Sequence, residues 1–558
     1  MTPKTKAESP PEIVATLKAL EDQTDTCYQS LRLLRRGWNF ATWLSLTECI
    51  RRIESLIAPT QYGTGLHQAA LVNLGKAAAQ MCKFTHLYSK QTLVSPSAFR
   101  WTLRTADECA EAFEVAYQYS MFCVDFPAWH ANLYAAELLN ATTIRFHSGT
   151  TELGRRVLAY QKGIRPASFV SEKADRPEIG SPYLNELISK ILQASSKRGL
   201  YGVKFGNNIE KARVHLQDVY EQRLSERFRR YPNISVGDYT LAEFRSFYVS
   251  LLAIVSIHEY LCFLWSRSHT LPLDSCVMVY PRTKWIQLIS RYSGAPSSLT
   301  ERIIPDLTFD AHKPLDLQLV PFVPLATDNS LLAVAPAFPL GSNWEENILR
   351  TCSYRRPKVY SQTSLTKEDE MREQLKARIG GARKVSGPWK LLKGMPDLDL
   401  VIEDESTSSL IVVELKWPRK PNHAREICDR NAEIRKGISQ IKAIKLYLNA
   451  NLSFLADRRY TQRPMSSYQT IQFCVVARDH ILAGEDSEFP VYGYDAFLSL
   501  MSGQMDTPAA IEFLNSMAWL PKEGHDYNIS WVPYTAGGIT VIGEMYIPVQ
   551  VKSVLKHD

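Results

Sequence analysis

Hydrophobic and polar residues alternate over a short stretch in the last third of the chain. Between residues 397 and 402, leucine or isoleucine occupies every second position, and two aspartates and a valine occupy the others. This period of two is typical of a β-strand. A polar, turn-prone run at 403–409 follows, and the aliphatic run at 410–413 indicates a second, largely buried strand. The pattern predicts a β-hairpin.

Further elements are predicted on both sides of this hairpin. Upstream, apolar residues at helical spacing follow a capping-box-like start at 366–369 and end at Gly380-Gly381. Downstream, a long amphipathic helix follows Pro418. Beyond it we expect strands at 471–477 and 491–494, a helix near 497–501 and a late β-hairpin within 531–551. Whether this hairpin belongs to the same sheet is left open by the sequence. The order of elements favours a mixed-sheet α/β core in the C-terminal region.

The sequence before this α/β core predicts a different, mainly helical organisation. We expect a flexible tail at 1–11, a mainly α-helical region at 12–300 that forms one domain or two subdomains divided near 148–182, a small β-containing connector at 301–353, a linker at 354–364 and the α/β domain at 365–558. Within the connector, 317–323 and 331–335 resemble short strands, and Pro321 limits the first to a sheet edge. The fold class predicted is multidomain, with a helical N-terminal region and a C-terminal α/β core.

Composition narrows the class of protein. The chain has 558 residues, 45% of them hydrophobic, and a formal net charge of +7, which is modest for this length. Its ten cysteines include no CxxC pair, so we expect reduced thiols and a cytoplasmic location. The longest apolar run, 248–265, contains His258 and Glu259, whose polarity favours a buried core helix over a membrane span. No phosphate-binding GxxxxGK[ST] loop is present in the sequence, which argues against a built-in ATPase motor.

The predicted hairpin gathers groups capable of chemistry. Glu414 and Lys416 are two residues apart, so both leave the same face of the second strand, and pairing brings Asp399 toward Glu414. Two adjacent carboxylates repel unless a cation lies between them. Oxygen ligands of this kind suit Mg²⁺, with Mn²⁺ as a substitute, and a metal there would polarise a phosphoryl oxygen or a bound water. The arrangement predicts metal-assisted hydrolysis.

Asp399, the hairpin and Glu414-Leu415-Lys416 together resemble the PD-(D/E)xK (restriction-endonuclease-like) nuclease superfamily. The resemblance implies that Asp399 and Glu414 bind Mg²⁺ with the backbone carbonyl of Leu415, that Lys416 activates water, and that cleavage leaves a 5′-phosphate. Asp397, which follows Pro396, competes with Asp399 for the first acidic role. We favour Asp399 because it leads directly into an apolar run.

Accessory residues are predicted on the two flanking helices. Members of the superfamily often carry a further glutamate on the helix before the acidic strand, and Glu370 and Glu373 are the candidates, with solvated surface acids as the alternative for each. On the following helix, Gln440 and Lys436 are candidates for supporting or phosphate-contacting roles, against ordinary surface positions. Nine basic residues but only three acidic ones lie between 416 and 445, which favours a polyanionic partner.

These features predict a Mg²⁺-dependent nuclease that acts on nucleic acid, with DNA favoured. The helical region would select substrate, or bind a protein partner or a second copy of the chain, and phage defence or DNA repair fits such an architecture by analogy. Two alternatives stay open. One is a catalytically silent nuclease fold that binds nucleic acid or protein, and the other is a nuclease subunit activated by a partner.

Overall fold

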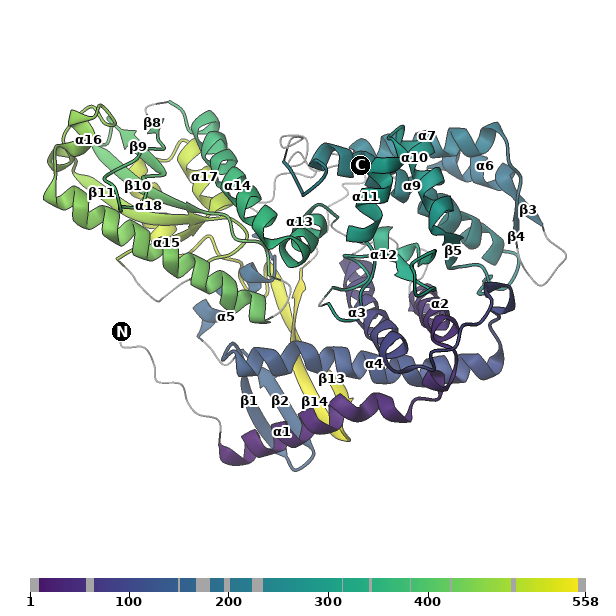
Figure 1. Cartoon of the computed structure of the whole chain (residues 1–558). Helices are drawn as coiled ribbons and strands as arrows, with labels where there is room; N and C mark the ends of the chain where they lie inside the picture. The colour runs from purple at the N-terminus through teal and green to yellow at the C-terminus, as the bar shows by residue number, and fades with distance from the viewer. Residues whose placement is uncertain are drawn as a thin grey trace, which may run out of the picture.

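The computed structural model shows a multidomain α/β protein with several separate sheets (Figure 1). It describes residues 10–56, 65–148, 151–166, 181–194, 201–222, 234–313, 315–340, 344–381, 383–421, 424–482 and 488–549. Most of the expected tail at 1–11 and much of the expected division at 148–182 lie outside these residues.

The C-terminal core contains a five-stranded mixed sheet in the order β12-β11-β10-β9-β8. Its strands are β8 (Arg383–Ser386), β9 (Leu400–Asp404), β10 (Ser409–Lys416), β11 (Thr470–Ala477) and β12 (Val491–Gly493). β10 pairs antiparallel with β9 and parallel with β11, so it occupies the centre. Every residue of β10 except Lys416 is buried, as its aliphatic sequence requires.

Helices cover this sheet. They are α14 (Pro357–Arg378), α15 (Ala424–Ala450), α17 (Tyr494–Ser502) and α18 (Thr507–Asn515), with the short α16 (Phe454–Asp457) after α15. α15 packs along β10 and β11, and α14 packs against β8, β10 and α17. In Figure 1 the long α15 crosses the sheet and α14 descends beside α17. The two helices that flank the predicted hairpin in sequence therefore both reach its central strand.

Some local predictions for this region are wrong. The expected linker at 354–364 is helical, because α13 (Trp344–Arg355) ends there and α14 begins at Pro357, a residue favoured in the first helical turn. The capping-box-like sequence at 366–369 therefore lies inside α14 instead of at its start. β8 was not predicted, and β9 begins at Leu400 instead of 397, although Leu398 bridges to Trp389 just before it.

The late hairpin does not extend this sheet. β13 (Tyr527–Ala536) and β14 (Ile539–Pro548) join β1 (Ala135–Asn140) and β2 (Thr143–His147) in a four-stranded sheet of order β1-β2-β14-β13. β14 runs parallel to β2, and α1 (Pro11–Thr26) and α4 (Leu103–His130) lie beside this sheet in Figure 1. The C-terminal domain expected at 365–558 therefore leaves out β1 and β2, which share a sheet with its last hairpin. No local sequence pattern encodes this pairing.

α5 (Glu152–Gln161) is a second link between distant parts of the chain. Arg156 donates hydrogen bonds to the carbonyls of Met517, Leu520 and Pro521, and Gln161 donates one to Ile481. Tyr160 packs edge-on against Trp519. The expected loop at 148–182 thus contains a helix that is fixed to the C-terminal core.

The N-terminal region is mainly helical, as predicted. Its helices are α2 (Trp38–Leu56), α3 (Gly65–Tyr88), α6 (Pro182–Ile191), α7 (Asn207–Gln222), α9 (Leu241–Ser266), α10 (Arg282–Ser293), α11 (Ser297–Asp306) and α12 (Ala337–Leu340). Two short strands, β3 (Leu192–Ala194) and β4 (Tyr201–Val203), form a hairpin. β5 (Met278–Pro281), β7 (Leu331–Val334) and β6 (Val323–Pro324) form a three-stranded sheet. The predicted strand at 317–323 is reduced to its last residue.

α9 contains the long apolar run. Among the described residues it is the one helix long and apolar enough to cross a membrane, and 72% of its most apolar window is buried inside the protein. His258 within it receives a hydrogen bond from, or donates one to, the Tyr201 hydroxyl at 2.7 Å, and burial lowers its pKa to about 4. A buried core helix and a satisfied neutral histidine account for this segment.

Candidate active site at the edge of the C-terminal sheet

Asp399, Glu414 and Lys416 meet at one end of the five-stranded sheet. Val413 pairs with Leu400, and continuing this antiparallel register places Asp399 beside Glu414. Asp399 Oδ2 accepts a hydrogen bond from the Leu415 N–H at 2.8 Å. The Lys416 ammonium lies 2.5 Å from Glu414 Oε1, as expected for side chains on one face of a strand. The tertiary structure thus gathers the three residues singled out from the sequence.

Burial dominates the electrostatics of the two acids. It raises the pKa of Glu414 to about 8, and the neighbouring charges of Asp399 and Glu368 act in the same direction against the attraction of Lys416. Burial also raises the pKa of Asp399, although the Leu415 N–H, Lys416 and Arg372 oppose this rise. Burial lowers the pKa of Lys416, but attraction to the surrounding acids outweighs it and the net change is a rise. The site holds more carboxylates than one ammonium can neutralise.

One oxygen of Glu414 has no partner. Oε1 receives the Lys416 ammonium, whereas Oε2 is buried and makes no hydrogen bond within the described residues. A buried carboxylate oxygen without a donor costs free energy on the order of 1–3 kcal/mol or more. Oε2 therefore keeps a free acceptor position beside two further acids.

Glu368 of α14 is a further member of the cluster that the sequence-based prediction missed. Burial raises its pKa, with Lys416 lowering it and Asp399 raising it, so its carboxylate lies within electrostatic reach of both. Glu368 is three residues before Met371 and seven before Leu375, both fully buried, and therefore belongs to the face of α14 that packs on the sheet. This helical spacing was present in the sequence and identifies Glu368.

The two predicted accessory acids lie on other faces of α14. Glu370 accepts a hydrogen bond from Gln374 at 3.0 Å, and Glu373 is largely exposed and pairs with Lys376. Neither makes a hydrogen bond or ion pair with Asp399, Glu414 or Lys416 in the described part of the chain. The face of α14 that packs on the sheet passes through 368, 371 and 375, so a role for Glu370 or Glu373 in the site stays a prediction.

Arg372 holds Asp399 in place. Its guanidinium donates to the Asp399 carbonyl at 3.1 Å and to Oδ1 at 3.2 Å, and it also pairs with Asp369. Gly387 also packs closely on the backbone of Asp399, because a Cβ at its position would lie 2.5 Å from the Asp399 carbonyl oxygen, and its φ of +128° favours glycine. Arg372 was not predicted as a site residue.

α15 packs directly on the site lysine through a glycine. A Cβ at Gly437 would lie 3.1 Å from Lys416 Cγ and 3.2 Å from Cε, so the missing side chain leaves room for the lysine stem. Gln440 follows one turn later on the same helix face, and its buried Oε1 makes no hydrogen bond among the described residues. Lys436 is exposed. Gln440 is thus placed near the site with an unused acceptor, whereas Lys436 faces solvent beside it.

Asp397 and Leu415 are the other residues that were given roles in the predicted site. Asp397 is exposed and precedes the Trp389–Leu398 bridge, so it lies outside the group formed by Asp399, Glu414 and Lys416. Leu415 is placed as expected, but the group it directs to Asp399 is its N–H. The role of its carbonyl as a metal ligand stays a prediction.

Comparison of the chain with protein-family models, with curated proteins and with solved structures finds no match.

The oxygen atoms of the cluster differ in how far they are already occupied by hydrogen bonds. Within the described ranges, no three Asp, Glu, His or Cys side chains already converge as a ligand cluster. Asp399 is turned to Arg372 and the Leu415 N–H, and Glu414 Oε1 to Lys416. The free Oε2 of Glu414 and the nearby carboxylate of Glu368 nevertheless offer hard oxygen atoms, the type of donor that Mg²⁺ prefers.

Part of the basic sequence around the site is already neutralised. Arg419 is buried and pairs with Glu426, and Arg430 pairs with Glu433. The basic residues that remain exposed include Lys384, Lys390, Lys393, Lys436 and Lys442, which come from β8, the following loop and α15. Lys384 pairs with Glu403, away from the end of the sheet that holds Asp399 and Glu414, so the positive charge around the site is smaller than the sequence count indicates.

Proposed function

We propose that the chain is a metal-dependent nuclease of the restriction-endonuclease-like class, which hydrolyses phosphodiester bonds, with DNA as the favoured substrate and the cytoplasm as its location. The observation that carries the proposal is the unpartnered Glu414 Oε2 in a cluster with Asp399, Glu368 and Lys416. The central hairpin, with α14 before it and α15 after it, is the arrangement expected of that class.

The residues of the site would have three roles: metal binding, orientation of the attacking water, and positioning of Asp399 and of the substrate. Glu414, Asp399 and Glu368 would hold Mg²⁺, which when bound supplies charge for a phosphoryl oxygen and lowers the pKa of water. Lys416 is protonated, and its ammonium would orient the attacking water and stabilise charge that develops on the phosphate. Arg372 keeps Asp399 from rotating, and the exposed lysines attract the substrate backbone.

The proposal is tested with the full chain on single-stranded, duplex and branched DNA and on RNA, with Mg²⁺ or Mn²⁺. We expect metal-dependent cleavage to 5′-phosphate ends, and a loss of about 10²-fold or more in rate for Lys416→Ala and Glu414→Gln. The matched control is Lys376→Ala, which removes a lysine from an exposed pair with Glu373 on α14. Equal cleavage rates for the wild type, Lys416→Ala, Glu414→Gln and Lys376→Ala would show that the site is assigned wrongly.

A nuclease subunit that waits for a partner is the second candidate. It is favoured by the closed pairs Lys416–Glu414 and Arg372–Asp399, which occupy the oxygens that a metal would need. On this reading the isolated chain binds DNA through its basic surround and cleaves nothing until a partner opens those pairs. Cleavage by the purified chain alone would eliminate it, and a silent chain that cleaves after addition of cell extract only when Lys416 is intact would support it.

A further inference from the structure

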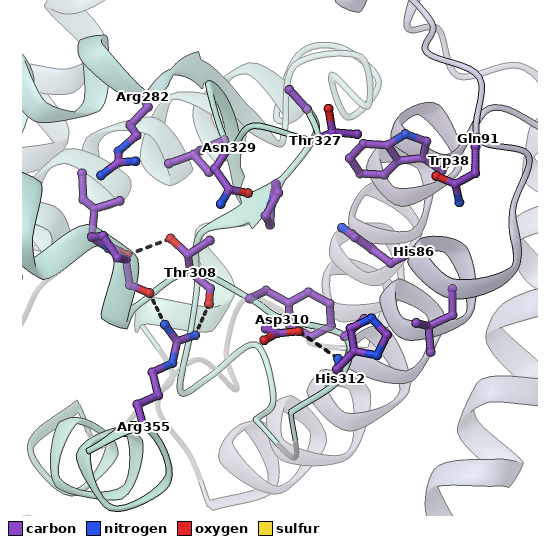
Figure 2. A pocket seen from close by; sticks show the side chains of 18 residues that line it. Trp38, His86, Gln91, Arg282, Thr308, Asp310, His312, Thr327, Asn329 and Arg355 are labelled. Carbon is purple, nitrogen blue, oxygen red and sulfur yellow. Dashed lines mark hydrogen bonds between the residues drawn. The ribbon is translucent and has the colours of Figure 1, made fainter.

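A cavity of about 500 Å³ lies in the N-terminal region, built from elements that do not contribute to the C-terminal sheet (Figure 2). Its walls come from the start of α2, the end of α3, the loop after α11, the β6–β7 turn, the start of α10 and the end of α13. It opens to solvent, and its volume is within the range of about 300–1,000 Å³ usual for small-molecule sites.

One wall is aromatic. The rings of Trp38 and His86 are 5.0 Å apart between centroids, and those of His86 and Phe309 are 5.5 Å apart. Figure 2 shows His86 reaching from its helix toward the interior of the cavity. His86 Nδ1 bonds to the Cys82 carbonyl at 2.8 Å. Burial lowers the pKa of His86, against the opposing effect of the Cys82 and Pro324 carbonyls, so the neutral ring contributes an aromatic surface to this wall.

The opposite wall carries positive charge. Figure 2 places Arg282 and Arg355 across the cavity from Trp38 and His86. Arg355 is fixed by hydrogen bonds to the carbonyls of Pro305 and Thr308, so it contributes charge with little freedom to move. Arg282 makes one long hydrogen bond of 3.4 Å to the Glu301 carbonyl, which leaves most of its guanidinium donors available to a ligand.

The cavity also contains one acid. Asp310 Oδ1 accepts the His312 N–H at 3.0 Å, which fixes its carboxylate at the cavity floor. Two guanidinium groups against one carboxylate leave the lining net positive. A ligand that fits it is therefore anionic, carries a flat ring for the aromatic wall, and has hydroxyl or amino groups for Asp310.

We propose that this cavity binds a free mononucleotide, with the phosphate at Arg282 and the base against Trp38 and His86. Each recognition element matches one part of that ligand: the guanidinium fork matches the phosphate oxygens, the ring wall matches the base, and the carboxylate matches the sugar hydroxyls or an exocyclic amine. The proposal is independent of the nuclease assignment, because it uses other residues.

The test is calorimetric titration of the full chain with AMP, GMP, CMP and UMP, with the four matching nucleosides and inorganic phosphate as comparison ligands. We expect at least one mononucleotide to bind, and its nucleoside to bind about ten-fold or more weakly. Arg282→Ala should weaken the mononucleotide by a similar factor. The matched control is Arg291→Ala on the same helix, an exposed arginine outside the cavity.

A second measurement does not depend on variant stability. Photo-crosslinking of the wild-type chain with an azido-mononucleotide should label peptides that contain Trp38, His86 or Phe309. Labelling elsewhere, equal affinity for nucleoside and nucleotide, or full affinity in Arg282→Ala would each overturn the proposal. Failure of all four mononucleotides to bind, or binding of oligonucleotides only, would overturn it as well.

Discussion

The substitution Glu414→Gln gives the sharpest test of how the site is built. Glutamine keeps an oxygen for the Lys416 ammonium but carries no charge, so it mimics the protonated carboxyl. Burial moves the pKa of this carboxyl from the usual 4.5 to about 8. Since each factor of ten in protonation corresponds to about 1.4 kcal/mol, ionised Glu414 destabilises the folded state by at most on the order of 5 kcal/mol.

The sign of the pH dependence follows from that shift. Below pH 4.5 the carboxyl is protonated in the folded and unfolded states, and it costs nothing. Between pH 4.5 and about 8 the unfolded chain ionises while the folded chain does not, so stability is lost as the pH rises. Glu414→Gln should therefore match the wild type near pH 5 and exceed it by several kcal/mol near pH 8.5, without added metal.

Hydrogen exchange followed by mass spectrometry on peptides from β9 and β10 measures this locally, which suits a multidomain chain whose global unfolding need not be two-state. Variant and wild type are compared at the same pH, so intrinsic exchange rates cancel. The control is Glu403→Gln, because Glu403 is also buried but accepts hydrogen bonds from Gln462 and Tyr468. It should be less stable than the wild type at both pH values.

Addition of Mg²⁺ near pH 8.5 should reverse the order, because the ion stabilises only a chain that can hold it. Wild-type β10 should gain protection and Glu414→Gln should gain little. If Glu414→Gln is less protected than the wild type near pH 8.5 without metal, Glu414 is not a strained anion. Equal protection of both proteins by Mg²⁺ would show that Glu414 is not a ligand.

Three further outcomes are expected. Gly437→Ala should lower the cleavage rate by displacing Lys416, while helix propensity favours the variant by about 1 kcal/mol; an unchanged rate would show that the lysine does not need this space. Glu368→Gln should reduce cleavage about 10-fold or more and Glu370→Gln should not, as measured with the same substrate; the reverse order would restore the accessory acid predicted from the sequence. Arg156→Ala should lower the local free energy of opening by about 2–4 kcal/mol in hydrogen exchange of peptides from α5, because several carbonyls lose their donor; a loss under about 0.5 kcal/mol would show that this contact is dispensable.

The local pattern was sufficient for the central hairpin and for three residues of the candidate site. The alternation of apolar and polar residues predicts the strands, and the spacing of two residues places Glu414 and Lys416 on one face of β10. Both are properties of a single strand. Antiparallel pairing across a short turn then required Asp399 to approach Glu414. The long helix α15, the strand β11 and the late hairpin were also evident from periodicity alone.

Other features depend on contacts between residues far apart in the chain, which periodicity does not encode. The partner of the β13–β14 hairpin is decided by β2, some four hundred residues earlier, and both have the same alternating pattern as any half-buried strand. The hydrogen bonds from Arg372 to Asp399 exist only once α14 is packed against β10. The cavity beside Arg282 joins six separate segments, so only the packed structure brings its aromatic and cationic walls to face each other.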